Sequence, residues 1–327
     1  MESRTKPHAL VWFPRSEEPH WGIPPNCEKL LECHFHLVWL KDLLDNPTLG
    51  LDIQAAFGYY CDPVTLTIET RPQWFPNLKT VVCVSTGFDH MDMEKYKQLG
   101  IRVYNCVSYS EATAEHAFLL ILATARDFIK KVQETKTAVE CVGSMTDPAP
   151  GLSGSTLGVI GLGKIGTKVA KCARIFDTRI LYHNRRARDS RLDEEDGFVY
   201  ASSLALLLQE SDYILVTCPL TDKTRLMIGR EQFKMMKSTA AIVNVARAEI
   251  IDQDALLDAL QRGKLRSAAL DVTSPPVLPT GHPLLTLPNV IITNHCGYCT
   301  HRSIENIFRE AVYKALDGLT KDQCHVE

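Results

Sequence analysis

The sequence lacks any long apolar run. Its longest largely apolar stretch, Ala117 to Ala125, is much shorter than the roughly 20 residues that a membrane-spanning helix needs. The first residues, Met1 to Pro14, do not carry the charged and apolar segments of a secretory signal, and residues 325–327 are not a peroxisomal address. We therefore expect no membrane insertion, no secretion and a cytoplasmic location.

An excess of one charge sign is also missing. The 327 residues include 36 Lys+Arg against 39 Asp+Glu, with a net charge of -3 and a pI near 6.4. A nucleic-acid-binding protein usually carries a clear basic excess, so we expect no nucleic-acid partner. No internal repeat is present, which excludes a solenoid. The length and the 45% hydrophobic content suit two globular domains.

Disulfide and metal frameworks have little support. The 11 cysteines are odd in number and scattered, so reduced thiols are a better interpretation than a set of disulfides. Cys296 and Cys299 form one CxxC pair, but a zinc site needs further ligands at suitable spacing, and none is evident. The sequence therefore predicts no metal site.

Short apolar runs separated by helical segments, Gly and Pro predict the strands. In the first half, we expect strands at residues 9–13, 35–39, 53–57 and 80–84, with a helix at 28–33. After a Gly/Pro-rich stretch at residues 143–154, we expect strands at 157–160, 179–183, 213–217, 240–245, 267–272 and 290–293. Strands and helices in succession predict an α/β fold of doubly wound parallel sheets, with ligands beyond the carboxyl ends of the strands.

Two longer helices complete the predicted pattern. The first spans Thr113 to Phe128, with Thr113 as a candidate N-cap. The second spans Thr300 to Leu319, has apolar residues at helical spacing and has Gly318 placed to cap it. This amphipathic pattern predicts that the last helix packs on a core.

A glycine-rich turn follows the predicted strand at 157–160. Gly161, Leu162, Gly163, Lys164, Ile165 and Gly166 form a GxGxxG sequence that opens a helical stretch. In such a loop the glycines permit a tight turn, a close approach of pyrophosphate and close helix packing, while the helix N-terminus attracts the phosphates. The loop predicts a dinucleotide site; the alternative is a glycine turn without a ligand.

The next predicted strand, at residues 179–183, is followed by Asn184, Arg185 and Arg186. A site selective for NAD usually has an acidic residue here, which would repel a 2′-phosphate, whereas two guanidinium groups can bind that phosphate. We therefore predict NADPH as the cofactor, with NADH possible. The alternative is that these arginines and Arg188 form a charged surface facing residues 193–196.

Three residues with suitable chemistry stand at the ends of later strands. Hydride transfer to a 2-oxo acid needs a cation for the substrate and an acid that protonates the new alkoxide. Arg247 follows one strand, Asp271 lies in the next and His295 follows the last. Each has a structural alternative on its own, a loop arginine, a buried cap and a core histidine, but their joint placement favours a site.

Several segments of the sequence together resemble those of a known family. Asn244 to Arg247, Leu270 to Pro275, His282 to Leu285 and His295 to Gly297, together with the glycine loop, are similar to the D-2-hydroxyacid dehydrogenases. Residues 271–285 and 300–302 look most like the animal glyoxylate/hydroxypyruvate reductases. The resemblance extends from about Val81 to Leu319.

The resemblance implies roles for particular residues. Arg247 would bind the 2-oxo acid, His295 would be the general acid, and Asp271 would hydrogen-bond the nicotinamide carboxamide. The backbone N–H groups of Thr86 and Gly87 would hold the substrate carboxylate. Further residues expected to line the cofactor pocket are Cys218, Pro219, Val245, Ala246 and Gly297.

The resemblance also implies the architecture. A flavodoxin-like substrate domain would comprise residues 1–110 and 300–327, and a Rossmann nucleotide-binding domain, residues 111–299, would be inserted into it. The family's members imply a homodimer.

The sequence departs from the family at three places. Pro276 stands where the family normally has a Glu that hydrogen-bonds the catalytic histidine. Without that carboxylate the pKa of His295 should be lower, so we expect a slower reductase with an acid-shifted pH optimum. Ala248 replaces a glycine, and residues 134–154 lack the tryptophans of the animal reductases, which weakens any inference about substrate size.

These observations predict an NADPH-dependent reductase of small 2-oxo acids, glyoxylate or hydroxypyruvate first. One alternative is a reductase of sugar acids such as 2-ketogluconate. Another is a non-catalytic NAD(P)-binding interaction protein, which resembles the dehydrogenase-like transcriptional corepressors. Retention of Arg247 and His295 favours catalysis, whereas Pro276 favours the binding protein. The sequence leaves open the physiological substrate, the direction of the reaction and the oligomeric state.

Overall fold

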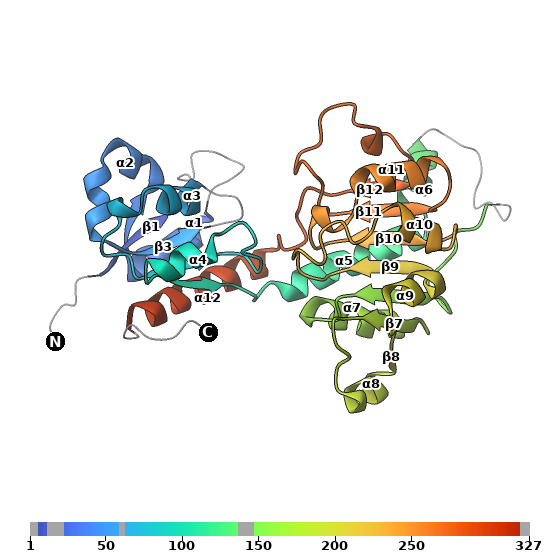
Figure 1. Cartoon of the computed structure of the whole chain (residues 1–327). Helices are drawn as coiled ribbons and strands as arrows, with labels where there is room; N and C mark the ends of the chain where they lie inside the picture. The colour runs from blue at the N-terminus through green and yellow to red at the C-terminus, as the bar shows by residue number, and fades with distance from the viewer. Residues whose placement is uncertain (1–5, 12–22, 59–62, 137–146, 321–327) are drawn as a thin grey trace. The chain divides into compact units, whose positions relative to one another are not determined.

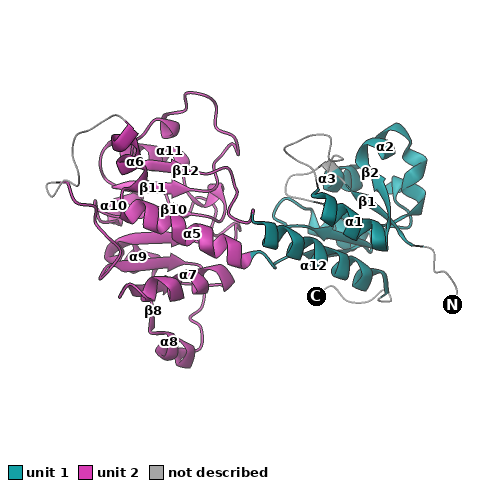
Figure 2. Ribbon diagram, turned by 180° about the vertical axis from the view of Figure 1, so that it is seen from behind, with its two compact units in different colours: residues 1–109, 300–327 teal, residues 110–299 magenta. Residues whose placement is uncertain are grey.

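The chain contains two parallel sheets, each flanked by helices, as Figure 1 shows for a computed structural model. The structure describes residues 6–11, 23–58, 63–136 and 147–320. It divides into two compact units, unit 1 with residues 1–109 and 300–327, and unit 2 with residues 110–299 (Figure 2). The predicted α/β class is thus confirmed. None of the described helices combines the length and the apolar character needed to cross a bilayer.

Unit 1 is built on a five-stranded parallel sheet with the order β2-β1-β3-β4-β5, which is the flavodoxin-like order. The strands are β1 (His8–Val11), β2 (His36–Trp39), β3 (Ile53–Gly58), β4 (Thr80–Cys83) and β5 (Arg102–Asn105). The helices are α1 (Pro25–His34), α2 (Leu40–Asp45), α3 (Pro63–Thr70), α4 (Met93–Gln98) and α12 (His301–Thr320), with 3-10 turns η1 (Pro47–Asp52) and η2 (Pro72–Trp74). Each of the four strands predicted here is present; β5 was not predicted, and residues 12–13 of the first predicted strand lie outside the described residues.

Helix α12 returns from the end of the chain to complete the core of unit 1. Ile307, Phe308 and Ala311 are buried in the same cluster as side chains of β1, β3 and β4. The prediction that Gly318 caps this helix is wrong, because the helix continues to Thr320. Gly318 instead allows close packing, since a Cβ there would lie 2.6 Å from the Thr80 hydroxyl oxygen.

Unit 2 is built on a seven-stranded parallel sheet with the order β12-β11-β10-β9-β6-β7-β8. Its strands are β6 (Thr156–Ile160), β7 (Arg179–His183), β8 (Phe198–Tyr200), β9 (Tyr213–Val216), β10 (Ala241–Asn244), β11 (Ser267–Leu270) and β12 (Val290–Ile292). Its helices are α5 (Ser110–Ala125), α6 (Phe128–Lys136), α7 (Lys164–Arg174), α8 (Ser190–Asp196), α9 (Leu204–Glu210), α10 (Arg230–Met235) and α11 (Gln253–Gln261), with 3-10 turns η3 (Ala248–Ile250) and η4 (Pro283–Leu285). The six predicted strands are present and β8 is additional.

The helix predicted at residues 113–128 has different ends in the structure. Helix α5 begins at Ser110, and Thr113 is buried inside it, so Thr113 is not its N-cap. The helix ends at Ala125, and Asp127 adopts a left-handed φ of 46° before α6 begins. The Arg266 guanidinium donates to the Thr124 carbonyl at 3.0 Å and pairs with Asp127 at 2.9 Å, which stabilises the break.

The order of the strands fixes where a ligand would bind. The chain reverses direction across the sheet between β6 and β9, and the carboxyl ends of parallel strands at such a switch point form a crevice. Ile160, the last residue of β6, is in register with His183 of β7 and with Val216 of β9. The segments that follow these three strands therefore meet at one edge of the sheet.

Candidate nucleotide and reaction site

The glycine loop connects β6 to α7 at the switch point. Gly161 has a φ of 98°, and a Cβ on it would lie 2.5 Å from the Cys218 backbone nitrogen. A Cβ on Gly166 would lie 2.7 Å from the Gly161 carbonyl oxygen. Gly163 differs, because a Cβ there would meet no atom within 4 Å. Two of the glycines thus close the loop against β9 and α7, while the third leaves open space.

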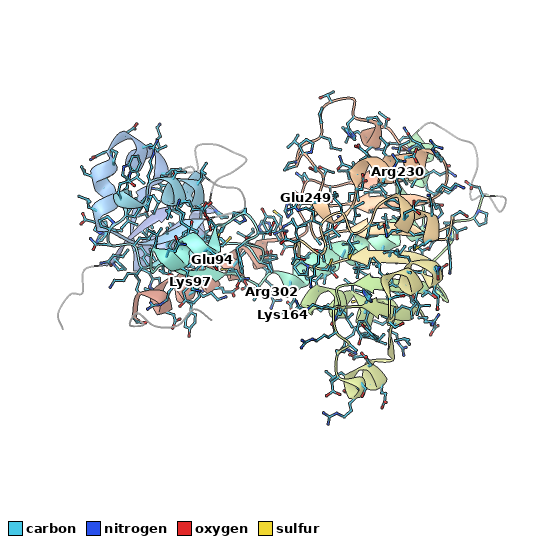
Figure 3. The ribbon with its side chains drawn as sticks, in the orientation of Figure 1. Glu94, Lys97, Lys164, Arg230, Glu249 and Arg302 are labelled. Carbon is cyan, nitrogen blue, oxygen red and sulfur yellow. The ribbon has the colours of Figure 1, made fainter. Side chains whose placement is uncertain are left out.

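The start of α7 provides the charge environment that a phosphate needs. Gly163 is the N-cap of this helix, so backbone N–H groups point toward the space beside it. Lys164 is the first residue of the helix, and its side chain is exposed (Figure 3). The pyrophosphate of a dinucleotide fits this place, because there is open space, the N–H groups of a helix start lack intrahelical partners, and a cation is near.

Asn184 holds the glycine loop in place. Its side-chain oxygen accepts a hydrogen bond of 2.7 Å from the backbone N–H of Leu162. The Gly161 N–H donates to the His183 carbonyl at 3.0 Å, so the ends of β6 and β7 are joined by two hydrogen bonds. Asn184 thus shapes the loop, a function that its position in the sequence did not indicate.

The three arginines after β7 have different environments. Arg188 is fixed, because its guanidinium donates to Asp193 and to Asp196, the latter at 2.8 Å. Arg185 and Arg186 are exposed and make no ion pair or hydrogen bond with the residues that the structure describes. The alternative that these arginines form a charged surface with residues 193–196 therefore holds for Arg188. The guanidinium groups of Arg185 and Arg186 are available for an anion.

The ends of β9 and β10 form the next part of the edge. Cys218 is buried and lies against the glycine loop, and burial raises the pKa of its thiol to about 11. After β10, the Asn244 side chain accepts from the Ala246 N–H at 3.0 Å and donates to the Arg247 carbonyl at 2.9 Å. This compact turn, which also contains buried Val245, fixes the backbone from which Arg247 projects. Pro219 is exposed beside Cys218.

His295 follows β12 at the same edge of the sheet. Its backbone is left-handed, with a φ of 57°. Burial of the imidazole is the largest effect on its pKa and lowers it; the Asp271 carboxylate opposes this effect, and the positive charge of Arg247 adds to it. Arg247 and His295 are therefore close enough to interact electrostatically.

Asp271 is the first residue after β11 and is 2% exposed. One of its oxygens accepts from the Thr293 hydroxyl at 2.6 Å and from the Cys296 N–H at 3.0 Å; the other accepts from the Gly297 N–H at 2.9 Å. His116 approaches the first oxygen at 3.3 Å. Burial alone would raise the pKa of Asp271, but these hydrogen bonds hold it below its ordinary value. Its bonding to a nicotinamide carboxamide stays a prediction.

Pro276, which stands where the family normally has a Glu, lies five residues after Asp271 in the chain. The Gln253 side chain donates to the Ser274 carbonyl at 2.7 Å and accepts from the Ser274 N–H at 3.0 Å. Pro276 is exposed, and its carbonyl accepts from the Thr273 hydroxyl at 3.2 Å. The hydrogen bond at Pro276 is thus made by its backbone, whereas Asp271 is the carboxylate whose charge acts on His295.

The predicted carboxylate-binding loop belongs to unit 1 and follows β4. The Thr86 N–H donates to the Tyr109 hydroxyl, and the Thr86 hydroxyl donates to the Cys106 carbonyl at 3.1 Å. The Gly87 carbonyl accepts from Ser85 at 2.7 Å. The Thr86 N–H thus already has a partner within its own unit, and a substrate carboxylate would have to replace the Tyr109 hydroxyl.

Sequence reasoning missed His116, Thr293 and Tyr109. His116 directly precedes the apolar stretch at residues 117–125, so a histidine inside the predicted helix at residues 113–128, next to its most apolar part, was the available signal. Its Nε2 lies 3.1 Å from the Thr293 hydroxyl oxygen. His116, Asp271 and Cys296 each bring a possible ligand atom within 4.8 Å of the others. Hydrogen bonds account for these positions, and we assign no metal there.

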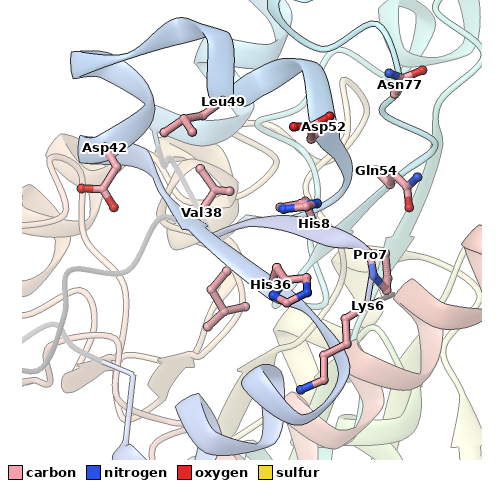
Figure 4. A pocket seen from close by; sticks show the side chains of 11 residues that line it. Lys6, Pro7, His8, His36, Val38, Asp42, Leu49, Asp52, Gln54 and Asn77 are labelled. Atoms are coloured by element: carbon pink, nitrogen blue, oxygen red, sulfur yellow. The ribbon is translucent and has the colours of Figure 1, made fainter. Parts of the chain in front are cut away.

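A cavity of about 560 Å³ lies at the amino ends of strands in the unit 1 sheet (Figure 4). It is lined by the first residues of β1 and β2, His8 and His36, whose ring centroids are 5.2 Å apart, and by Asp42 and Asp52. Ligands of doubly wound sheets bind at the carboxyl ends of strands, whereas this cavity lies at the amino ends. We therefore assign it no part in the reaction.

Comparison with known proteins agrees with this geometry. Residues 118–297, more than half of the chain, match the family "D-isomer specific 2-hydroxyacid dehydrogenase, NAD binding domain". A human glyoxylate reductase/hydroxypyruvate reductase is 39% identical over 252 residues, 74% of each chain.

Two solved structures have the same fold. One is a D-lactate dehydrogenase from Aquifex aeolicus in complex with NAD and lactic acid, with a TM-score of 0.81, 29% identity and coverage of 95% of this chain and 97% of that one. The other is an NADPH-dependent glyoxylate/hydroxypyruvate reductase from Sinorhizobium meliloti in complex with NADP and malonate, with a TM-score of 0.79, 26% identity and coverage of 94% and 92%. The chain belongs to the D-isomer specific 2-hydroxyacid dehydrogenases and is an oxidoreductase.

Proposed function

We propose that the chain is an NADPH-dependent reductase of small 2-oxo acids, with glyoxylate or hydroxypyruvate as its substrate. The observation that carries the proposal is that Arg247 and His295 follow β10 and β12, two parallel strands of one sheet whose carboxyl ends lie at the same edge. A guanidinium and a titratable imidazole are the two groups that reduction of a 2-oxo acid requires. The human relative carries the same activity in its name.

Each residue has a defined task in the reaction. The Arg247 guanidinium binds the substrate carboxylate and polarises the ketone. His295, in its protonated form, donates a proton to the ketone oxygen as that oxygen becomes a hydroxyl. A bound nicotinamide supplies the hydride. Thr86 and Gly87 would hold a substrate carboxylate through backbone N–H groups, and the carboxylate would replace the Tyr109 hydroxyl as the acceptor of the Thr86 N–H.

The residues at the switch point fit a nicotinamide dinucleotide. The open space at Gly163 and the start of α7 would take the pyrophosphate. Arg185 and Arg186, which are exposed, would bind a 2′-phosphate, so we infer a preference for NADPH over NADH. The two solved relatives hold NADP and NAD respectively, so this preference depends on the two arginines of this chain.

The two units have different roles in this proposal. Residues 111–299 would form the nucleotide-binding domain, and residues 1–110 with 300–327 the substrate domain. We also infer a cytoplasmic homodimer. Residues 134–154, in which we expect contacts between the subunits, fall partly outside the described residues, at 137–146.

The test is the oxidation of NADPH with glyoxylate, hydroxypyruvate and 2-ketogluconate in parallel, from acid to neutral pH, with His295→Ala as the control. We expect turnover with the two smaller acids that increases toward acid pH and is lost in the control. Faster turnover of 2-ketogluconate would replace the proposed substrate by a sugar acid. Tight NADPH binding without turnover would contradict catalysis and favour a binding protein.

A further inference from the structure

His295 needs support from outside its own turn. A histidine with a φ of 57° is in the left-handed region, which residues with a Cβ rarely adopt. The neighbours of His295 provide few constraints, because Asn294 is exposed and Cys296 only half-buried. A side chain that must deliver a proton along one direction therefore depends on contacts that fix the backbone on both sides of it.

Asp271 makes those contacts. Its carboxylate accepts the N–H groups of Cys296 and Gly297, at 3.0 and 2.9 Å, and the hydroxyl of Thr293 at 2.6 Å. These residues lie on both sides of His295 along the chain. A buried carboxylate can hold them only as long as its own charge is stabilised.

His116 provides that stabilisation from helix α5. Its Nε2 lies 3.3 Å from the Asp271 oxygen and 3.1 Å from the Thr293 hydroxyl oxygen, and its side chain is 14% exposed. The Thr293 hydroxyl donates to Asp271 and can accept from His116, so a protonated Nε2 completes a closed set of hydrogen bonds. The ring also packs on the turn, since a Cβ on Gly297 would lie 3.3 Å from His116 Cδ2.

We propose that His116 is a positioning residue: through Asp271 and Thr293 it fixes residues 293–297 and so directs the His295 imidazole toward its substrate. The inference rests on the proposed reductase function, in which His295 is the general acid. His116 acts through Asp271 and does not itself touch the reactants.

Two substitutions of His116 distinguish the effect of its hydrogen-bond donor from the effect of the volume of its ring. His116→Leu fills a similar volume without a donor, whereas His116→Gln retains an N–H donor on a neutral side chain. We expect His116→Leu to slow the turnover of glyoxylate, measured as kcat, by about ten- to hundredfold, the range for residues that orient another functional group. We expect the KM for NADPH to change less than about twofold, and we expect His116→Gln to restore most of the turnover, because the donor and not the ring charge fixes the turn. The exposed His36 of unit 1 gives the matched control, His36→Leu, with wild-type kinetics.

Amide hydrogen exchange provides a readout that does not depend on catalysis. The Cys296 and Gly297 N–H groups should exchange faster in His116→Leu than in the wild type and at the wild-type rate in His36→Leu, because their acceptor is less firmly held. If the wild type reduces no 2-oxo acid, the proposed function fails, while faster exchange of these two amides alone still supports positioning by His116.

Three results would overturn the inference. The first is unchanged kcat together with unchanged amide exchange in His116→Leu. The second is a loss of kcat that His116→Gln does not restore. The third is stoichiometric zinc in the purified wild type that is lost in His116→Leu, since His116, Asp271 and Cys296 would then be metal ligands and not a hydrogen-bonded support.

Discussion

At the scale of single residues, the protonation of His295 controls the reaction that we propose. A general acid must be protonated, so the rate of reduction falls as the pH rises through the pKa of the imidazole. Burial lowers that pKa below its ordinary value, and the Arg247 charge lowers it further. The protonated fraction is therefore lost at a lower pH than for an exposed histidine, and the reductase should work best on the acid side of neutrality.

Installing a carboxylate at the position of the family glutamate should shift this profile. In Pro276→Glu we expect the pH at which kcat/KM falls to move upward by about 1 unit, because a nearby negative charge favours the imidazolium. The backbone contact of Pro276 with Thr273 does not depend on the side chain and should persist. The measurement is the pH dependence of kcat/KM for glyoxylate with NADPH.

The control for this substitution is Val277→Glu, which adds the same charge one residue away on a side chain that is 84% exposed. It should leave the profile in place, because the family glutamate that contacts the catalytic histidine stands at position 276 and not at 277, and water screens a charge that makes no such contact. An unchanged profile in Pro276→Glu would show that position 276 does not reach His295.

Cofactor choice should depend on two exposed arginines. We expect Arg185→Ala together with Arg186→Ala to lower kcat/KM for NADPH about tenfold or more and to change the value for NADH little, because only NADPH carries the 2′-phosphate. Arg191→Ala removes another exposed guanidinium, one that pairs with Asp189, and should have no such effect. Equal losses with both cofactors would contradict a phosphate contact.

Residue identity predicted the candidate site only in part. Arg247, Asp271 and His295 stand out because each follows a recognisable strand, and parallel strands bring such residues to one edge. The hydrogen bond from Leu162 to Asn184 and the contact of His116 with Asp271 join residues far apart in the chain. No local pattern encodes these contacts, since they depend on how α5 packs on the sheet and how β7 pairs within it.

At the scale of elements, two glycines of the same loop have different functions: Gly161 is needed for folding and Gly163 for binding the cofactor. Gly161→Ala would place a methyl group 2.5 Å from the Cys218 nitrogen at a φ of 98°, so we expect a loss of about 1–3 kcal/mol in the free energy of unfolding. Gly163→Ala meets open space at a φ of -93°, so unfolding should be almost unchanged while NADPH affinity falls, because the methyl group occupies the space of the pyrophosphate.

Thermal unfolding and NADPH fluorescence titration on both variants test this pair. The expected pattern is a lower Tm for Gly161→Ala and weaker binding at an unchanged Tm for Gly163→Ala. Wild-type affinity in Gly163→Ala would show that the cofactor does not approach the backbone there.

Every interior strand of the two sheets was predicted, whereas two of the four edge strands were not. The two missed strands, β5 and β8, each lie at one edge of their sheet, while the strands at the other edges, β2 and β12, were predicted. Arg102 to Asn105 are all only half-buried, and β8 has three residues with one exposed. Strands in the interior are buried on both faces and form continuous apolar runs, but an edge strand needs no such run. Helix ends were also poorly predicted, because burial of Thr113 and Gly318 depends on tertiary packing.

At the scale of the whole molecule, exposed apolar side chains on unit 2 offer a place for a second subunit. Leu119 of α5 and Ile175 after α7 are exposed, the latter by 80%. Each stands next to one member of the Phe118–Phe176 ring pair, whose centroids are 6.0 Å apart. The two exposed side chains therefore belong to neighbouring parts of one unit, where apolar exposure favours association.

Light scattering after size-exclusion chromatography should give a mass of about 73 kDa, two times 36.6 kDa. We expect Leu119→Glu with Ile175→Glu to shift the protein toward the monomer, because association would bury two charges. Val277→Glu, which adds a charge to an exposed side chain elsewhere on unit 2, should leave the mass unchanged. A wild-type monomer would contradict the inferred dimer.

The return of α12 to unit 1 has a consequence for the order of events during synthesis. Unit 2 is one continuous segment, residues 110–299, so its seven strands are all available once that segment has left the ribosome. Unit 1 must wait for α12, because Ile307, Phe308 and Ala311 fill its core. Unit 1, whose strands are translated first, is therefore completed after unit 2, and until α12 has emerged its apolar sheet face is exposed to chaperones and to other nascent chains.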